Sequence, residues 1–498
     1  MSQPVIETAS GRVEGASVDG LHHFLGIPYG GDTGAANRFR PPSAPAPWTG
    51  VRDATSYGPS SWQPSAPGAA ESLKMFGGSA EPSMGEDCLV LNVWTPGTAT
   101  ANRPVLVWIH GGGHTSGSGS WPAYDGASLA RRYDTVVVTV NHRLGLLGHL
   151  YLAEIGGEEY ASSGANAILD LVAALRWVRD NIGAFGGDPG NVLAYGESGG
   201  GWKTSTLLAM PSARGLFHRA SLMSGAGIRA QDPSVATAIA EKTLAFLGVD
   251  AGNLASLADL PAERLLEAQN AAGIPGFQPV LDGTNIVGHP LDLLRAGSTP
   301  DVPLLIGTTR DEFRTFAMAM PQPAPDADDA WLADQLRPLL GPKAIDVVAG
   351  YRAGRPEETA GDLQIAINTD HHMRIPSIRM AEAASGPGRA PVHMYRFDWE
   401  TPALGGMLKA GHGVDYPFFF DNLEAATVSS EGPGREALAG QMTAALIAFA
   451  RTGDPGHDGL PAWPPYDTGQ RATMLFDVTS TATDDPAGSE RALWDGIV

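Results

Sequence analysis

The chain has 498 residues, of which 43% are hydrophobic and 17% charged, and this composition predicts a globular protein with a large core. Its formal net charge of −21 argues against binding to nucleic acid or to anionic lipid, because like charges repel. The single cysteine, Cys88, excludes a disulfide within the chain and leaves too few thiolates for a zinc or iron–sulfur centre.

The N-terminal sequence MSQPVIE has neither the basic region nor the apolar stretch of a secretion signal. No uninterrupted apolar run in the chain approaches the length that spans a membrane. Together with the unpaired cysteine, these features predict a soluble cytoplasmic protein that uses no membrane partner.

Short runs rich in β-branched residues alternate with helical patterns along the chain. The runs cover 104–109, 135–140, 192–195, 220–223, 302–306 and 392–397. Between two of them, 165–185 carries apolar residues at helical spacing, and the sequence GGDP that follows predicts its end. This alternation predicts an α/β fold with a large, mostly parallel sheet flanked by helices.

Two other regions predict insertions at the rim of a pocket. Segment 62–84 is rich in Pro, Gly and Ser, and segment 321–384 is mainly amphipathic helix with turns. There is no internal repeat and no long linker. We therefore expect residues 1–498 to form one domain that contains both insertions.

The sequence GESGG at 196–200 has the pattern of a nucleophile elbow, G-x-S-x-G. It follows a strand-like run and precedes a helical pattern that starts at Gly201. In such a turn the serine has a strained backbone, and the flanking glycines let neighbouring segments come close. Ser198 is therefore predicted to present its hydroxyl to a pocket, beside a helix N-terminus that favours negative charge.

A second glycine-rich segment, HGGGH at 110–114, directly follows the run 104–109. Residues without side chains let backbone N–H groups point into a cavity. The amides of Gly112, Gly113 and Gly199 are predicted to form an oxyanion hole, and a flexible glycine turn is the alternative.

A serine hydroxyl needs a base, and histidine has a suitable pKa. In an elbow fold the acid and then the histidine follow the serine in the chain, and the histidines that meet this condition are His218, His289, His371, His372, His393, His412 and His457. His412 stands in the loop AGHGVDYPFFF, whose aromatic residues are suited to line an acyl pocket. For the acid, the loop GTTRDEF at 307–313 offers Asp311 or Glu312, and both can instead cap the following helix.

Together these segments resemble the type B carboxylesterases, the family of para-nitrobenzyl esterases, mammalian carboxylesterases and cholinesterases. The resemblance extends nearly from end to end. It includes FLGIPY at 24–29, RFRPP at 38–42, EDCLVLNV at 86–93, NHRLG at 141–145, FGGDP at 185–189 and WPPY at 463–466. It implies the α/β-hydrolase fold.

The resemblance also implies a catalytic triad in which Ser198 is the nucleophile, His412 the base and Glu312 the acid. Ser224, in the sequence MSG, matches a hydroxyl that supports the histidine–acid pair. Such a triad hydrolyses carboxylic esters through an acyl-enzyme, and water then releases the acid. The implied substrate is a small-molecule ester, and the reaction requires no metal or organic cofactor.

Some positions depart from the family pattern. Gly199 replaces a usual alanine, His114 a common aromatic residue and Phe313 a common glycine. We expect His114 and Phe313, together with Phe418, at the substrate pocket, where they affect substrate preference. In secreted members the cysteine that matches Cys88 closes a disulfide loop, so the unclipped segment 62–84 is expected to be a mobile pocket rim.

Other functions remain open at this stage. A lipase or an acyltransferase uses the same triad, and a non-catalytic binding protein can share the fold. A metal site at 370–372 (DHH) is a further alternative to an exposed polar helix start. The sequence does not name the natural ester or the oligomeric state.

Overall fold

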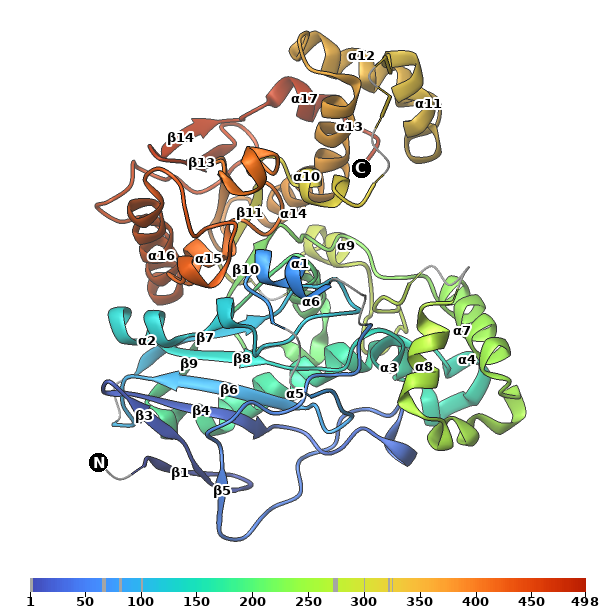
Figure 1. Ribbon diagram of the computed structural model, residues 1–498, viewed down its shortest axis with the longest axis vertical. Coiled ribbons are helices and arrows are strands. Elements are labelled where there is room, and N and C mark those ends of the chain that lie inside the picture. Colours follow the sequence, from blue (N-terminus) through green and yellow to red (C-terminus); the bar gives the residue numbers. More distant parts are fainter. Residues whose placement is uncertain are drawn as a thin grey trace.

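An eleven-stranded sheet runs through the centre of the protein and carries most of its core (Figure 1). The computed structural model describes residues 3–64, 69–79, 83–99, 102–271, 276–299, 301–320, 323–324 and 326–498. In spatial order the strands are β14 (Thr481–Asp484), β13 (Ala472–Phe476), β12 (Val392–Phe397), β11 (Leu304–Thr309), β10 (Arg219–Met223), β9 (Gly187–Glu197), β7 (Arg103–Ile109), β8 (Val136–Val140), β6 (Val90–Thr95), β4 (Leu21–Pro28) and β3 (Ala16–Val18). A separate small sheet contains β1 (Val5–Thr8), β2 (Gly11–Glu14) and β5 (Val51–Asp53).

The centre of the large sheet is parallel. Strands β8, β7, β9, β10, β11, β12 and β13 pair in parallel, and antiparallel pairs occur only towards the two edges. The β-branched runs predicted from the sequence correspond to β7, β8, β9, β10, β11 and β12. Every residue of β8 is buried, as expected for a parallel strand covered on both faces. The predicted α/β class is therefore confirmed.

Helices cover both faces of the sheet. Val105, Val107 and Ile109 of β7 share a core with α5 (Asn166–Asn181), α6 (Gly199–Ala209), α9 (Pro290–Arg295) and α14 (Ile375–Ala384). Leu106 and Trp108 face the opposite layer, which contains α2 (Ala127–Tyr133), α15 (Tyr416–Phe419) and α16 (Arg435–Thr452). This alternation follows from the two-residue period of a strand.

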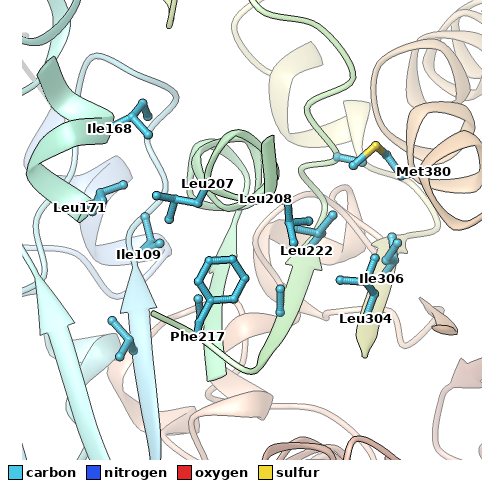
Figure 2. Close-up of a cluster of buried hydrophobic side chains, with 14 of the residues drawn as sticks. Ile109, Ile168, Leu171, Leu207, Leu208, Phe217, Leu222, Leu304, Ile306 and Met380 are labelled. Atoms are coloured by element: carbon cyan, nitrogen blue, oxygen red, sulfur yellow. The ribbon is translucent and has the colours of Figure 1, made fainter. Parts of the chain in front are cut away.

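The helix predicted at 165–185 is α5, which is followed by a 3-10 turn at Ile182–Phe185. Figure 2 shows Ile168 and Leu171 of this helix, together with Leu207 and Leu208 of α6, lying over strands β7 and β10. Helix α6 is thus held rigidly against the sheet, with its first residue directly after Ser198.

Two groups of helices lie beside the sheet, on the right of Figure 1. One group contains α3 (Gly145–His149), α4 (Ala153–Gly156), α7 (Pro233–Leu247) and α8 (Ala262–Gln269). The predicted helical insertion, 321–384, contains α11 (Asp329–Leu340), α12 (Ala344–Gly354), α13 (Ala360–Thr369), a π-helical turn at Asp370–Arg374, and α14. The short helices α10 (Phe313–Ala317) and α17 (Gly488–Ala492) lie against this second group.

The predicted rim segment, 62–84, contains helix α1 (Ala69–Met75). Residues 65–68 and 80–82 of this segment lie outside the described residues, and its mobility stays a prediction. Cys88, just beyond the segment, is buried, and burial raises the pKa of its thiol to about 12. Among the helices of the described ranges, none combines the length and the hydropathy that a membrane crossing requires.

Candidate active site

The residues predicted to carry chemistry meet at the carboxyl edge of the parallel strands. The glycine-rich segment 110–114 follows β7, Ser198 follows β9 and Glu312 comes shortly after β11. His412 lies in the loop between β12 and α15. This edge is where ligands bind in open α/β sheets.

Ser198 occupies the sharp turn between β9 and α6, with φ 56° and ψ −123°. Its amide donates a hydrogen bond of 2.8 Å to the carbonyl of Met223 in the neighbouring strand. The glycines around it are required by space, since a Cβ on Gly196 or Gly200 would lie 2.5 Å or 2.0 Å from the carbonyl oxygen of Ile109. The strained, closely packed turn predicted from GESGG is therefore present.

His412 and Glu312 form a buried pair. The Nδ1 atom of His412 lies 2.6 Å from Oε2 of Glu312, and the backbone amide of Thr309 donates to the other oxygen at 2.8 Å. Glu312 is 0% exposed, so its carboxylate is held away from solvent. Asp311, the alternative acid, instead pairs with Arg310 at 2.8 Å and accepts a hydrogen bond from the amide of Ala410. The geometry thus brings Glu312, and not Asp311, to the imidazole.

Ser198 and His412 line the same cavity, of about 260 Å³. Gly112 and Gly113 border it as well, with φ of 82° and 61° that favour glycine. Within the described ranges, the amides of Gly112, Gly113 and Gly199 donate no hydrogen bond to a protein acceptor. These three donors are available to an oxygen that develops negative charge in the cavity.

Gly199 and Gly113 are in close contact at this point. A Cβ on residue 199 would lie 2.0 Å from the carbonyl oxygen of Gly113. The usual alanine of the family pattern therefore does not fit here without a shift of the 110–114 loop. The glycine at position 199, where the family pattern usually has alanine, is thus explained by the close approach of Gly113.

Glu197 is a charged neighbour of the site that the sequence pattern did not single out. Its Oε1 lies 3.2 Å from Nε2 of His412, and the side chain is buried. Burial, opposed by His412, raises the pKa of Glu197 to about 8. Burial lowers the pKa of His412, but the carboxylates of Glu197 and Glu312 raise it to about 9. The only sequence signal was an acid at the variable position before the serine.

Asp415 adds a third carboxyl group near the imidazole. It is completely buried, and the hydroxyl of Tyr395 donates to its Oδ2 at 3.2 Å. Burial, helped by the negative charge of Glu312, raises the pKa of Asp415 to about 7. Asp415 therefore carries only part of a negative charge near neutral pH.

Ser224 differs from what the resemblance implies. Its amide donates to the carbonyl of Gly307 at 2.8 Å, but its buried hydroxyl makes no hydrogen bond with any described residue. A direct hydrogen bond from Ser224 to His412 or Glu312 is thus not seen, and its supporting role stays a prediction.

The three residues expected at the substrate pocket do not line the cavity that contains Ser198. Phe418 is 0% exposed and packs on Phe397 and Trp399, with ring centroids 5.2 Å and 5.1 Å away, so it belongs to the core and not to the cavity wall. Phe313 stacks on His372 at 4.9 Å and borders a different cavity.

The third expected residue, His114, borders a cavity separate from the one that contains Ser198. The side chains that do enclose the Ser198 cavity come from four separate segments and are mainly apolar. They are Leu73, Phe76, Trp121, Tyr124, Thr315, Phe316 and Tyr416. No local pattern in the sequence marked them as a group.

Lys203 lies five residues beyond the nucleophile on α6 and is 0% exposed. Its Nζ donates to the carbonyl of His110 at 3.0 Å, and burial lowers the pKa of its ammonium group to about 7. In the described part of the chain no carboxylate lies within ion-pair distance of it. A lysine in an otherwise apolar helix was the only sequence signal.

The metal alternative at 370–372 is not supported by the structure. Asp370 is bound by the guanidinium of Arg374 at 2.6 Å and by the hydroxyl of Tyr351. Across the described ranges, no three His, Cys, Asp or Glu side chains gather as a metal site would require. Asp370 and Arg374 of this turn form a structural ion pair.

Known proteins resemble the chain over nearly its whole length. The profile of the carboxylesterase family matches residues 2–494. The para-nitrobenzyl esterase of Bacillus subtilis is 37% identical over 99% of this chain and 98% of its own length. The phenmedipham hydrolase of Pseudarthrobacter oxydans is 36% identical over 95% of both chains.

The fold gives the same result. The crystal structure of a Geobacillus stearothermophilus carboxylesterase superimposes with a TM-score of 0.88 at 39% identity, covering 98% of this chain and 99% of that one. A para-nitrobenzyl esterase structure superimposes with a TM-score of 0.84 at 37% identity. The architecture is the α/β-hydrolase fold. The chain therefore belongs to the carboxylesterase family and is a carboxylic ester hydrolase.

Proposed function

We propose that Ser198, His412 and Glu312 are the catalytic triad of this esterase. The observation that carries the proposal is the 2.6 Å contact between Nδ1 of His412 and the buried Glu312, in a cavity that Ser198 also lines. Glu312 fixes the tautomer that leaves Nε2 free to accept a proton. Ser198 is the only hydroxyl-bearing residue of the strained elbow.

In the proposed reaction, His412 takes the proton of Ser198 as the serine oxygen attacks the ester carbonyl. The resulting oxyanion is bound by the amides of Gly112, Gly113 and Gly199, each of which contributes roughly 10²–10³ in rate. His412 then gives its proton to the alcohol oxygen, and the carbon–oxygen bond breaks. Water repeats the cycle and releases the carboxylic acid.

The residues that line the cavity indicate which class of alcohol group the ester carries. Because His412 must protonate the departing alcohol, that group lies in the cavity that His412 borders. The walls there include Phe76, Trp121 and Phe316, which are aromatic. We infer that esters of apolar or aromatic alcohols are the preferred class, since burial of their apolar surface strengthens binding.

The test is the rate of benzyl acetate hydrolysis by Ser198→Ala. The expected loss in kcat is on the order of 10⁴ or more. Ser430→Ala, a serine on a remote surface turn, is the matched control and keeps the parent rate. Labelling of Ser198 by a fluorophosphonate, read by mass spectrometry, gives an independent result. A loss of only a few-fold, or labelling elsewhere, contradicts the mechanism.

We further infer that residues 1–498 act as one catalytic domain in the cytoplasm. The lone, buried Cys88 supports a reducing compartment, because the fold depends on no disulfide within the chain. Fractionation of the source cells, with activity assayed in each fraction, tests the location. Activity mainly outside the cytoplasm contradicts it.

A further inference from the structure

A second cavity, of about 310 Å³, lies next to the first one. Its polar wall residues are His114, Thr206, Arg229, Gln278, His371 and His372, and Trp202 forms an aromatic side. Neither the triad nor the oxyanion amides border it. The proposed mechanism therefore leaves this cavity without a role.

The two cavities are bordered by the same two segments, the 110–114 loop and the turn from Ser198 into α6. Gly113 borders the first cavity and the next residue, His114, borders the second. On α6, the amide of Trp202 donates to the carbonyl of Ser198 at 3.1 Å, so Trp202 lies one turn from the nucleophile. The rings of His114 and Trp202 stack at 5.8 Å. The second cavity therefore begins one residue beyond Gly113 in the chain and one helical turn beyond Ser198.

The second cavity is rich in hydrogen-bond donors. None of its described wall residues is an aspartate or a glutamate. The guanidinium of Arg229 has no ion-pair partner in the described ranges, and its one side-chain contact is with Nε2 of His289, at 3.0 Å. Arg229, an exposed residue, is the one charged donor of this described wall, and a guanidinium without a carboxylate partner favours an anionic ligand.

The imidazoles at this wall are neutral and poorly satisfied. The Nδ1 atoms of His114 and His371 are buried and have no hydrogen-bond partner among the described residues. Burial holds the pKa of His114 well below its ordinary value and lowers the pKa of His372 to about 4. At neutral pH, each ring can therefore offer one N–H to an acceptor without adding charge.

The chemistry of the reaction assigns this cavity to the acyl half. The departing alcohol occupies the cavity that His412 borders, because His412 protonates it. The acyl chain extends away from that side of the carbonyl, and the second cavity lies one residue beyond Gly113 and one helical turn beyond Ser198. The acyl half therefore meets Arg229, Gln278 and the imidazoles.

We propose that the second cavity binds a carboxylate on the acyl half, so that the enzyme prefers half-esters of dicarboxylic acids with an apolar alcohol. This inference rests on the proposed function. Water cleaves such a half-ester into the free dicarboxylate and the alcohol. The net charge of −21 opposes the approach of an anion, but at physiological salt this repulsion is screened beyond about 8 Å. Close contacts then decide the preference.

The experiment compares two matched series at pH 7.5 and 0.15 M salt. The monobenzyl esters of succinate, adipate and suberate are measured against benzyl butyrate, hexanoate and octanoate, with release of benzyl alcohol followed by chromatography. The expected result is one chain length at which kcat/KM of the half-ester exceeds that of its uncharged partner by about tenfold. Charge-assisted hydrogen bonds of this kind account for such a factor.

Arg229→Gln is expected to lower that ratio by about tenfold. Arg176→Gln is the matched control, because Arg176 is an exposed arginine on α5 that borders neither cavity and has no ion pair in the described ranges. It should leave the ratio unchanged. A half-ester that is disfavoured at every length, or a ratio that survives Arg229→Gln, overturns the proposal.

A second measurement needs no variant. Free adipate is expected to inhibit hydrolysis of benzyl acetate competitively, with an inhibition constant about tenfold lower than that of hexanoate. Equal inhibition by the two acids overturns the proposal.

If benzyl hexanoate is cleaved through Ser198 but the half-esters are not preferred, the acyl-site inference alone fails. If Ser198→Ala keeps its activity, the proposed function fails.

Discussion

The Oε1 atom of Glu197 lies 3.2 Å from Nε2 of His412, the ring nitrogen that does not face Glu312. The imidazole is therefore held between two buried carboxylates. Both stabilise the protonated ring, and they raise the pKa of His412 to about 9 although burial by itself lowers it. His412 therefore becomes the free base at a higher pH than an ordinary imidazole does.

The first prediction concerns Glu197→Gln. Removal of this anion destabilises the imidazolium, so the pKa of His412 falls, and the rise of kcat/KM with pH moves to lower pH by about one unit or more. Profiles between pH 5 and 10, with benzyl acetate as substrate, measure the shift. Glu424→Gln, an exposed glutamate on a distant turn, should leave the profile in place. A shift to higher pH would falsify the assignment.

The second prediction separates the two adjacent acids. Glu312→Gln leaves a neutral partner at Nδ1, and kcat should fall on the order of 10³–10⁴. Asp311→Asn provides the matched comparison, because Asp311 contacts Arg310 and the amide of Ala410 instead of the imidazole. It should lower kcat by less than about tenfold. Equal losses in the two variants are incompatible with the observed geometry.

The third prediction concerns the contact between the elbow and the oxyanion loop. Gly199→Ala places a methyl group 2.0 Å from the carbonyl oxygen of Gly113, so the 110–114 loop must move. A displacement of about 1 Å of catalytic groups costs roughly 10² in kcat. Gly440→Ala, on the open side of α16 with no atom near the new methyl, should keep kcat and should not lower the melting temperature, because alanine favours the helix. An unchanged rate in Gly199→Ala means that the amides are not catalytic.

The fourth prediction concerns stability and pH. Burial lowers the pKa of Lys203 from 10.5 to about 7, so between these values the unfolded chain binds a proton that the folded chain does not. This group therefore destabilises the fold fully below pH 7, and the penalty disappears as pH rises towards 10.5. Lys203→Met should be more stable than the parent by a margin that shrinks over this range.

Urea unfolding at pH 6, 7, 8 and 9 measures that margin. The lost hydrogen bond to His110 offsets about 1 kcal/mol of the gain, but it does not change with pH. Lys242→Met, an exposed lysine on α7, should give a flat difference across the series. A margin for Lys203→Met that is constant with pH contradicts the lowered pKa.

Local sequence signals located the elbow because its physical requirements are met within a few consecutive residues. Gly196 and Gly200 are dictated by contact with Ile109, and residues 192–197 of the strand before Ser198 are all buried. The parallel strands were equally visible, since a strand buried on both faces is a continuous β-branched run. The helix α5 was also predictable, because its apolar residues recur at helical spacing.

The surroundings of the site were not predictable in this way. Phe418 stands in an aromatic run beside His412, yet it faces Phe397 and Trp399 because the short helix α15 packs that side on the sheet. Which aromatic residues face a cavity depends on how distant loops pack. The role of Glu197 was not predictable either, because the fold alone brings its carboxylate to His412, which lies on a loop far along the chain.

Cys88 gives the protein a practical property. The only thiol of the chain is buried and its pKa is raised to about 12, so it stays protonated and unreactive towards alkylating reagents in the folded state. A cysteine introduced on the surface would then be the single labelling position. A fluorophore or spin label attached at a described residue of 62–84, paired with one on a fixed helix, can test whether this segment moves during turnover without removal of the native residue.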